Sequence, residues 1–147
     1  MSDFSSSLSI AVFGEILAID QLARNRISKA LPRGMELSHF SVLNSLARSG
    51  AERTPAQLAR TFHLTRGAMT NTLSKLEWAG WVHVRPDWDD ARRKLVSISP
   101  AGLAARNAAV AAIAPIIDDV TAKVGEDRMR ATLPVLRELR QQLEGPD

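Results

Sequence analysis

The chain has 147 residues and a mass of 16.1 kDa, a length that predicts one domain whose core needs neither a metal ion nor a disulfide. Hydrophobic residues make up 45% of the sequence and charged residues 24%, which excludes a disordered or collagen-like chain. There is no cysteine, so disulfides, thiolate metal sites, thiol nucleophiles and thiol redox sensing are excluded together.

The amino-terminal residues lack the basic region that opens a secretory signal peptide. The longest nearly apolar run extends from Ala108 to Ile117, ten residues, which is too short to cross a bilayer. We therefore expect a cytoplasmic protein that has no membrane partner.

Positive charge is concentrated in the middle of the chain. The net charge is only +3, but the segment from Arg48 to Lys94 holds nine bases and five acids, and the rest of the chain is slightly acidic. Local positive charge favours a polyanionic partner, because each neutralised phosphate releases condensed counterions. A solvated basic surface with no partner explains the charge equally well, so charge alone leaves both interpretations open.

The first half of the chain reads as a series of helices. Apolar residues at helical spacing predict a long helix from about Leu8 to Leu31. Ser38 is the expected N-cap of the next helix, and Gly50 is its expected end.

Two further helices have stronger start signals. Thr54, Pro55 and Gln57 form a capping-box pattern with proline at the first helical position, and this helix is short. After a tight break, Thr65 is a second N-cap, and it opens a helix that Gly80 ends.

The periodicity then changes. Residues 81–85 and 95–98 alternate between apolar and polar and are rich in strand formers, which predicts a β-hairpin. The charged segment between them is longer than a usual hairpin loop of two to five residues, which suggests that it has a use. A helix from Ser99 to about Lys123 is expected to kink at Pro115. A last helix is predicted to start at about Gly125. Pro134 lies near this position and favours a later start.

A short capped helix, a tight turn, a second helix and a charged hairpin together make a winged helix-turn-helix. The inner face of the second helix carries Met69, Leu73 and Leu76. Its start and outer face carry the residues that we expect to bind DNA: Thr65, Arg66, Thr70, Asn71, Ser74 and Lys75. Arginine can pair with guanine, asparagine with adenine, and threonine can contact the thymine methyl group. A polar outer face is also common on helices with no such partner.

The hairpin and its flanks resemble one known family. The residues that carry the likeness are 76–82, Pro86-Asp87, Asp90-Ala91-Arg92 in the wing, and residues 95–102, which end in Ser99-Pro100-Ala101-Gly102. They are similar to the MarR (multiple antibiotic resistance regulator) family, and the likeness covers essentially the full length of the chain.

The resemblance implies a mainly α fold with a small β-hairpin wing, in which a winged helix-turn-helix is flanked by dimerisation helices. It implies a single MarR-like domain over residues 1–147, with the winged helix-turn-helix at about 38–99 and dimerisation helices at about 4–32 and 100–145. It further implies a homodimeric, sequence-specific transcriptional regulator of double-stranded DNA. Such a protein is a repressor of a pseudo-palindromic operator that a small-molecule effector releases.

The resemblance also assigns roles to wing residues. Arg92 matches the arginine that enters the minor groove, Asp90 matches the acid that orients it, and Arg93 is added to the DNA-binding set. Val84 stands where the family often has arginine, and the neighbouring Arg85 should point to the opposite face of its strand. An effector pocket would be lined by Phe13, Leu17, Phe40 and Leu43, although core packing is the commoner role for such residues.

Three tryptophans lie close together in this region. Trp78 and Trp81 are expected to pack the helix end against the hairpin. Trp88 lies in the loop, where we expect it to fold back on the wing rather than to contact a partner.

No enzyme is expected, because the sequence has no G-x-S-x-G, P-loop or dinucleotide-binding motif. His39, His63 and His83 do not have metal-ligand spacing, and no metal or other cofactor is expected. The alternative function is a winged-helix architectural or protein-interaction module that does not read DNA sequence. The sequence does not determine the operator, the regulated genes, the effector, or whether the protein represses or activates.

Overall fold

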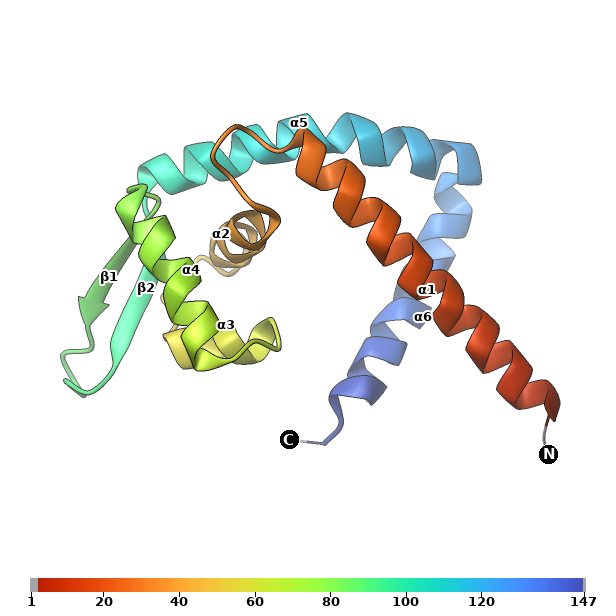
Figure 1. The fold of residues 1–147 in the computed structure, drawn as a ribbon, viewed down its shortest axis with the longest axis horizontal. Helices are drawn as coiled ribbons and strands as arrows, with labels where there is room; N and C mark the ends of the chain where they lie inside the picture. Colours follow the sequence, from red (N-terminus) through yellow and green to blue (C-terminus); the bar gives the residue numbers. More distant parts are fainter. Residues whose placement is uncertain (1–2, 147) are drawn as a thin grey trace. The chain divides into compact units, whose positions relative to one another are not determined.

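A computed structural model describes residues 3–146 (Figure 1). In chain order its elements are α1 (Asp3–Ala30), α2 (Leu37–Ser49), α3 (Pro55–Thr61), α4 (Arg66–Trp78), β1 (Val82–Pro86), β2 (Lys94–Ile98), α5 (Pro100–Val124) and α6 (Glu126–Glu144). They form two compact units, one up to Ala112 and one from Ile113 onwards. This mainly helical fold with a two-stranded hairpin confirms the fold class expected from the sequence.

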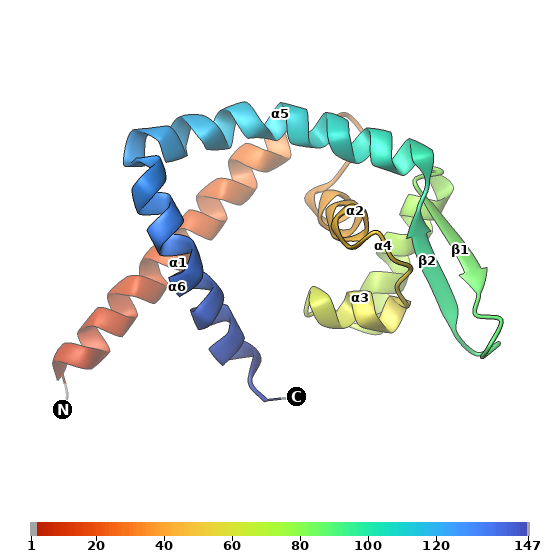
Figure 2. The same cartoon turned by 180° about the vertical axis from the view of Figure 1, so that it is seen from behind.

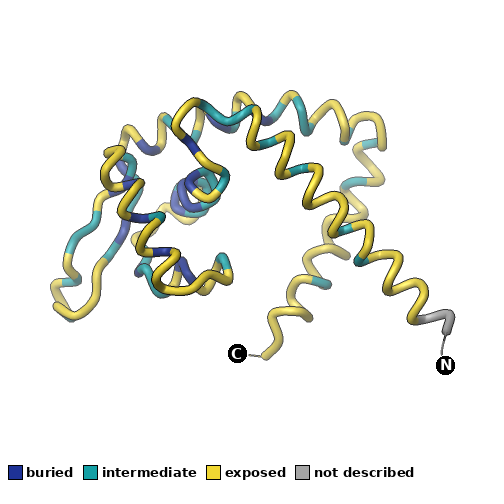
Figure 3. Tube along the Cα trace, viewed as in Figure 1, coloured by how far each residue is buried: buried dark blue, intermediate teal, exposed yellow. Residues whose placement is uncertain are grey.

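The core of the first unit lies among α2, α3, α4 and the hairpin, where the buried residues gather (Figures 2 and 3). The predicted inner face of α4 is confirmed, since Met69, Leu73 and Leu76 are all buried there. The largest fully buried side chains of this core are Val42, Leu43, Leu46, Leu58, Met69, Leu76 and Val96. The helix-turn-helix and the wing therefore share one core, which holds α4 and the hairpin in a fixed relation.

Both predicted caps of the helix-turn-helix are confirmed. The backbone N–H of Gln57 donates to the Thr54 hydroxyl at 3.1 Å, and the backbone N–H of Thr54 donates to the Gln57 side-chain oxygen at 2.9 Å. The Ala68 N–H donates to the Thr65 hydroxyl at 3.1 Å, so α4 begins at Arg66. In the turn between the two helices, His63 has a positive φ of 53°.

The start of α2 differs from the expectation. The helix begins at Leu37 with Glu36 as its N-cap, not Ser38. The buried His39 lies three residues after Glu36, and its Nδ1 accepts the Glu36 N–H at 3.1 Å. A histidine that replaces the usual glutamate or glutamine of a capping box hides this signal in the sequence. Gly50 ends the helix in the left-handed region, as expected.

The hairpin is antiparallel, with Val82 opposite Ile98, Val84 opposite Val96, and Pro86 opposite Lys94. Beside β2, the backbone of Arg53 exchanges two hydrogen bonds with that of Val96, at 2.9 and 2.7 Å. These bonds attach the α2–α3 loop to the wing.

The start of α5 is tied to the end of α4. The buried Ser99 hydroxyl donates to the Gly80 carbonyl at 2.6 Å and accepts the Gly102 N–H at 2.9 Å. The helix then continues through Pro115. In the second unit, α6 begins at Glu126 and contains Pro134, so the expectation of a later start is wrong.

The long helices expose many apolar side chains. On α1, Leu8, Ile10, Leu17 and Leu22 are 62–73% exposed, and α6 has no buried residue. By length and composition alone, Ser6–Ala30 and Pro100–Val124 could each cross a membrane, so the short apolar run seen in the sequence understated their hydropathy. This is weak evidence for a membrane, because core helices and helices that pair with another chain have the same composition.

Candidate nucleic-acid interface

The outer face of α4 carries small and polar side chains that point away from the core. Arg66, Thr70, Asn71, Ser74 and Lys75 are all exposed, because the apolar residues on the opposite side hold the helix against its neighbours. A helix presented in this way fits the major groove of B-DNA, which is wide enough to admit it.

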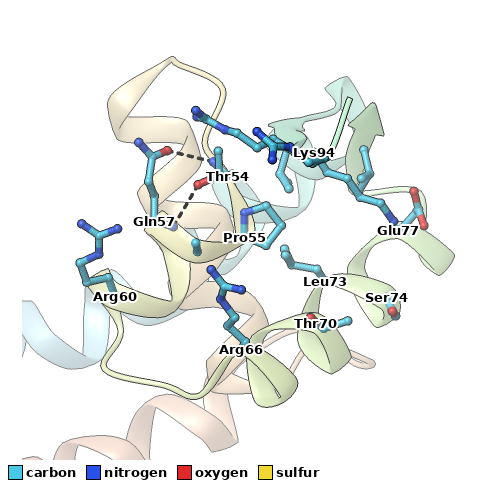
Figure 4. Close-up of a pocket in the computed structure, with 15 residues that line it drawn as sticks. Thr54, Pro55, Gln57, Arg60, Arg66, Thr70, Leu73, Ser74, Glu77 and Lys94 are labelled. Carbon is cyan, nitrogen blue, oxygen red and sulfur yellow. Dashed lines mark hydrogen bonds between the residues drawn. The ribbon is translucent and has the colours of Figure 1, made fainter. Parts of the chain in front are cut away.

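The wing and α4 line a common pocket of about 620 Å³ (Figure 4), which we call the basic hollow. Its walls are one side of α3 with its N-cap, one side of α4, and the hairpin. The charged residues that line it are Arg60, Arg66, Glu77, Arg92, Arg93 and Lys94. Five cations therefore face one acid, a balance that favours an anionic partner such as a phosphate backbone.

The wing arginine is held by the acid two residues before it. The Asp90 carboxylate accepts from the Arg92 backbone N–H at 3.1 Å and from its Nε at 3.2 Å. These hydrogen bonds hold the pKa of Asp90 below its usual value, and the side-chain bond has the larger effect. The Arg92 side chain is still 91% exposed, so its guanidinium is directed without being covered.

Arg85 braces the other face of the wing. It donates two hydrogen bonds to the Glu52 carboxylate, at 2.8 and 2.7 Å. This side-chain interaction is the largest of the effects that raise the pKa of Arg85. The guanidinium also lies over the Trp88 ring, 4.2 Å from its centroid. Val84 lines the basic hollow and Arg85 does not, which confirms that the two point to opposite faces.

The tryptophan expectations are met only in part. Trp81 is half-buried against the core, as expected. Trp78 is 93% exposed, because α4 ends there with its side chain on the outer side. Trp88 packs against Arg85 of β1, as expected for a side chain that folds back on the wing, although it stays 83% exposed.

The structure brings some of the predicted DNA-binding residues together and leaves others nearby. Those that line the basic hollow are Arg66, Thr70, Ser74, Arg92 and Arg93. Asn71 and Lys75 are exposed on α4 beside it, Thr65 caps the helix, and Asp90 orients Arg92. Their roles in binding stay predictions.

Five polar residues of the hollow were not among the predicted DNA-binding residues: Thr54, Gln57, Arg60, Glu77 and Lys94. Spacing on α4 offered a signal for Glu77, since it follows Thr70 by two turns. No local signal exists for Arg60, because only the packing of α3 against α4 brings it there.

The residues predicted for an effector pocket have different environments. Leu43 is fully buried in the core and Phe40 packs against that core, whereas Leu17 on α1 is 69% exposed. The effector site stays a prediction. Within the described residues, no group of three His, Cys, Asp or Glu side chains could hold a metal ion.

Comparison with known proteins finds similarity to one family. The MarR family sequence model matches residues 33–93, which include the whole helix-turn-helix and most of the wing. Multiple antibiotic resistance protein MarR of Salmonella typhimurium and its counterpart in Salmonella typhi are each 33% identical over 85 residues. The match covers 58% of this chain and 56% of each relative, so the chain matches about half the length of these curated proteins.

Solved structures extend the similarity over most of the chain. Wild-type MarR from E. coli without ligand is 25% identical with a TM-score of 0.72, over 84% of this chain and 93% of that one. A mutant E. coli MarR complexed with operator DNA is 23% identical with a TM-score of 0.76, over 95% of this chain and 99% of that one. The transcriptional regulator BldR from Sulfolobus solfataricus is 22% identical with a TM-score of 0.77, over 97% of this chain and 99% of that one. The chain is therefore similar to MarR-family proteins over its winged helix-turn-helix, and it has the fold of the MarR structures.

Proposed function

We propose that this protein is a cytoplasmic, homodimeric transcriptional regulator that binds double-stranded DNA in a sequence-specific way. The observation that carries the proposal is the basic hollow. In it the outer face of α4 and the wing arginines line one surface, which has five cations and one acid. A winged module that binds only other proteins has no need to bring these groups together.

In this function α4 enters the major groove. Arg66 and Thr70 lie in its first turns, from which side chains usually reach base edges. The wing reaches the adjacent minor groove with Arg92. Because Asp90 already directs that side chain, part of its ordering cost is met before DNA arrives.

A homodimer supplies the second half-site. Exposed apolar side chains on α1 and α6 form more apolar surface than a monomer usually presents to water. A two-fold pairing of these helices covers that surface and presents two α4 helices, which match operator half-sites about 34–36 Å apart. A small ligand that favours a different separation of the two helices releases the DNA, and the protein then acts as a repressor.

The test is a gel shift with the full-length protein and the intergenic DNA next to its own gene. A shift that persists in excess nonspecific competitor and depends on the DNA sequence supports the proposed regulator. Equal competition by any duplex favours the architectural module instead, and no shift at low salt removes DNA from the function altogether.

A further inference from the structure

Glu77 is the one acid among the charged residues that line the basic hollow. It lies on α4 on the same side as Thr70 and Ser74, near Val84 of the wing. In Figure 4 it shares the hairpin end of the hollow with Lys94, while Arg60 lies at the opposite end. DNA bound in the hollow must approach this carboxylate.

The Glu77 carboxylate has no partner among the residues that the structure describes. It is exposed, and within residues 3–146 its side chain makes no hydrogen bond and no ion pair within 4.0 Å. The adjacent strand position that faces the hollow is the uncharged Val84, and the neighbouring Arg85 is paired with Glu52 on the other face. The acidic side chain is therefore free to interact with whatever enters.

A free carboxylate on a phosphate-binding surface has two effects. It repels phosphates, and this raises the free energy of every complex in which the backbone comes close. It also accepts hydrogen bonds but donates none. Among the major-groove edges it best matches the N4 amino group of cytosine, because the adenine N6 amino group lies beside the N7 acceptor, which repels a carboxylate. A duplex without such a donor leaves the carboxylate desolvated and unpaired.

We infer that Glu77 is a specificity-determining residue of this interface, which selects operators that present a cytosine amino group to it and rejects other duplexes. The inference rests on the proposed DNA-binding function. It assigns to Glu77 a role opposite to that of the cations that contact phosphates, which raise affinity for all DNA alike.

The test uses the full-length wild-type protein and Glu77→Gln, which keeps the shape of the side chain and removes its charge. Each protein selects from a random duplex library, the bound DNA is sequenced, and affinity for a bulk random duplex is measured separately. We expect the variant to bind the bulk duplex about three- to tenfold more tightly. The wild-type motif should contain one cytosine position that the variant no longer selects.

Glu138→Gln on α6 is the matched control, since it changes the net charge equally but lies outside the hollow. It should leave both the motif and the bulk affinity at wild-type values. Thermal unfolding of all three proteins checks that the fold is retained, which is expected for an exposed side chain with no partner.

The other outcomes separate this inference from the proposed function. If Glu77→Gln has the wild-type motif and bulk affinity, the inference is wrong and the proposed function stands. If the variant binds every duplex more weakly, the carboxylate organises the wing cations instead, which also overturns the inference. A wild-type protein that selects no motif refutes sequence-specific regulation itself.

Discussion

At the scale of single residues, the interface depends on charged groups that are held but not covered. Asp90 directs Arg92 through two hydrogen bonds, while the guanidinium is almost fully exposed. An exposed ion pair of this kind adds little to folding stability. In the proposed function its value lies in fixing the direction of the side chain that enters the minor groove.

Arg92→Ala and Arg66→Ala should weaken DNA binding in different ways. Arg92→Ala is expected to lower affinity for all sequences and to reduce the salt slope by about one, because a contact near phosphates is lost. Arg66→Ala should cost about 1–3 kcal/mol and relax discrimination at particular base pairs. Binding titrations at several salt concentrations distinguish them, and two variants with wild-type affinity would show that the reading surface lies elsewhere.

His39 makes stability depend on pH. Burial, the largest effect, and Lys75 lower its pKa, while Glu36 opposes them. The native state thus binds fewer protons than the unfolded state below about pH 6.5, so the free energy of unfolding should fall as pH drops through that value and level off below the native pKa. Protonation also removes the Nδ1 acceptor that caps α2.

Urea unfolding at pH 7.5 and 5 measures this loss. His39→Gln is the matched variant, because glutamine does not titrate and its oxygen can still accept the Glu36 N–H. Its stability should depend less on pH than that of the wild-type protein. An identical pH dependence in both proteins would assign the effect to other groups.

At the scale of elements, the winged helix-turn-helix is stabilised by close backbone packing between α5 and the end of α4. The first turn of α5 lies directly against the backbone that leaves α4. A Cβ built on Gly102 would lie 1.9 Å from the Trp81 carbonyl oxygen and 3.0 Å from the Ile98 side chain. Gly67 on α4 is the opposite case, with nothing within 4 Å of its Cβ position.

Alanine at these two glycines should have opposite effects on stability. Gly102→Ala should lower the free energy of unfolding by about 3 kcal/mol or more, because backbone must shift to admit the methyl group. Gly67→Ala should raise it by about 0.5–1 kcal/mol, since alanine favours the helix. Chemical denaturation tests both, and a Gly102→Ala protein as stable as the wild type would contradict the packing of α5 on Trp81.

At the scale of the whole molecule, the flanking helices expose apolar side chains that the winged core does not cover. Leu17 on α1 is 69% exposed, and Leu136 and Leu143 on α6 are 43% and 72% exposed. In the proposed homodimer, pairing with a second copy would remove this surface from water, and each buried side chain would contribute about 1.5–3 kcal/mol at most.

Leu17→Glu and Leu136→Glu should therefore shift the protein from dimer to monomer. Sedimentation at micromolar concentration measures the mass, and operator affinity should fall with it, because a monomer binds one half-site. Glu138→Gln, which leaves the apolar surface unchanged, should remain dimeric. A wild-type protein that sediments as a monomer would contradict the proposed homodimer.

Local chemistry determined much of this protein from its sequence alone. The caps at Thr54 and Thr65, the buried face of α4 and the change to strand periodicity at residue 81 depend on residues within a few positions of each other. Together with the wing motif they predicted the winged helix-turn-helix and the resemblance to the MarR family.

Only the tertiary structure decided the rest, because it depends on contacts between residues distant in the chain. Arg85 pairs with Glu52, which lies 33 residues earlier, and Arg60 and Glu77 meet the wing cations across a shared hollow. The exposure of Trp78 likewise follows from where α4 ends on the core. Periodicity reports which face of an element is apolar, but packing determines what that face meets.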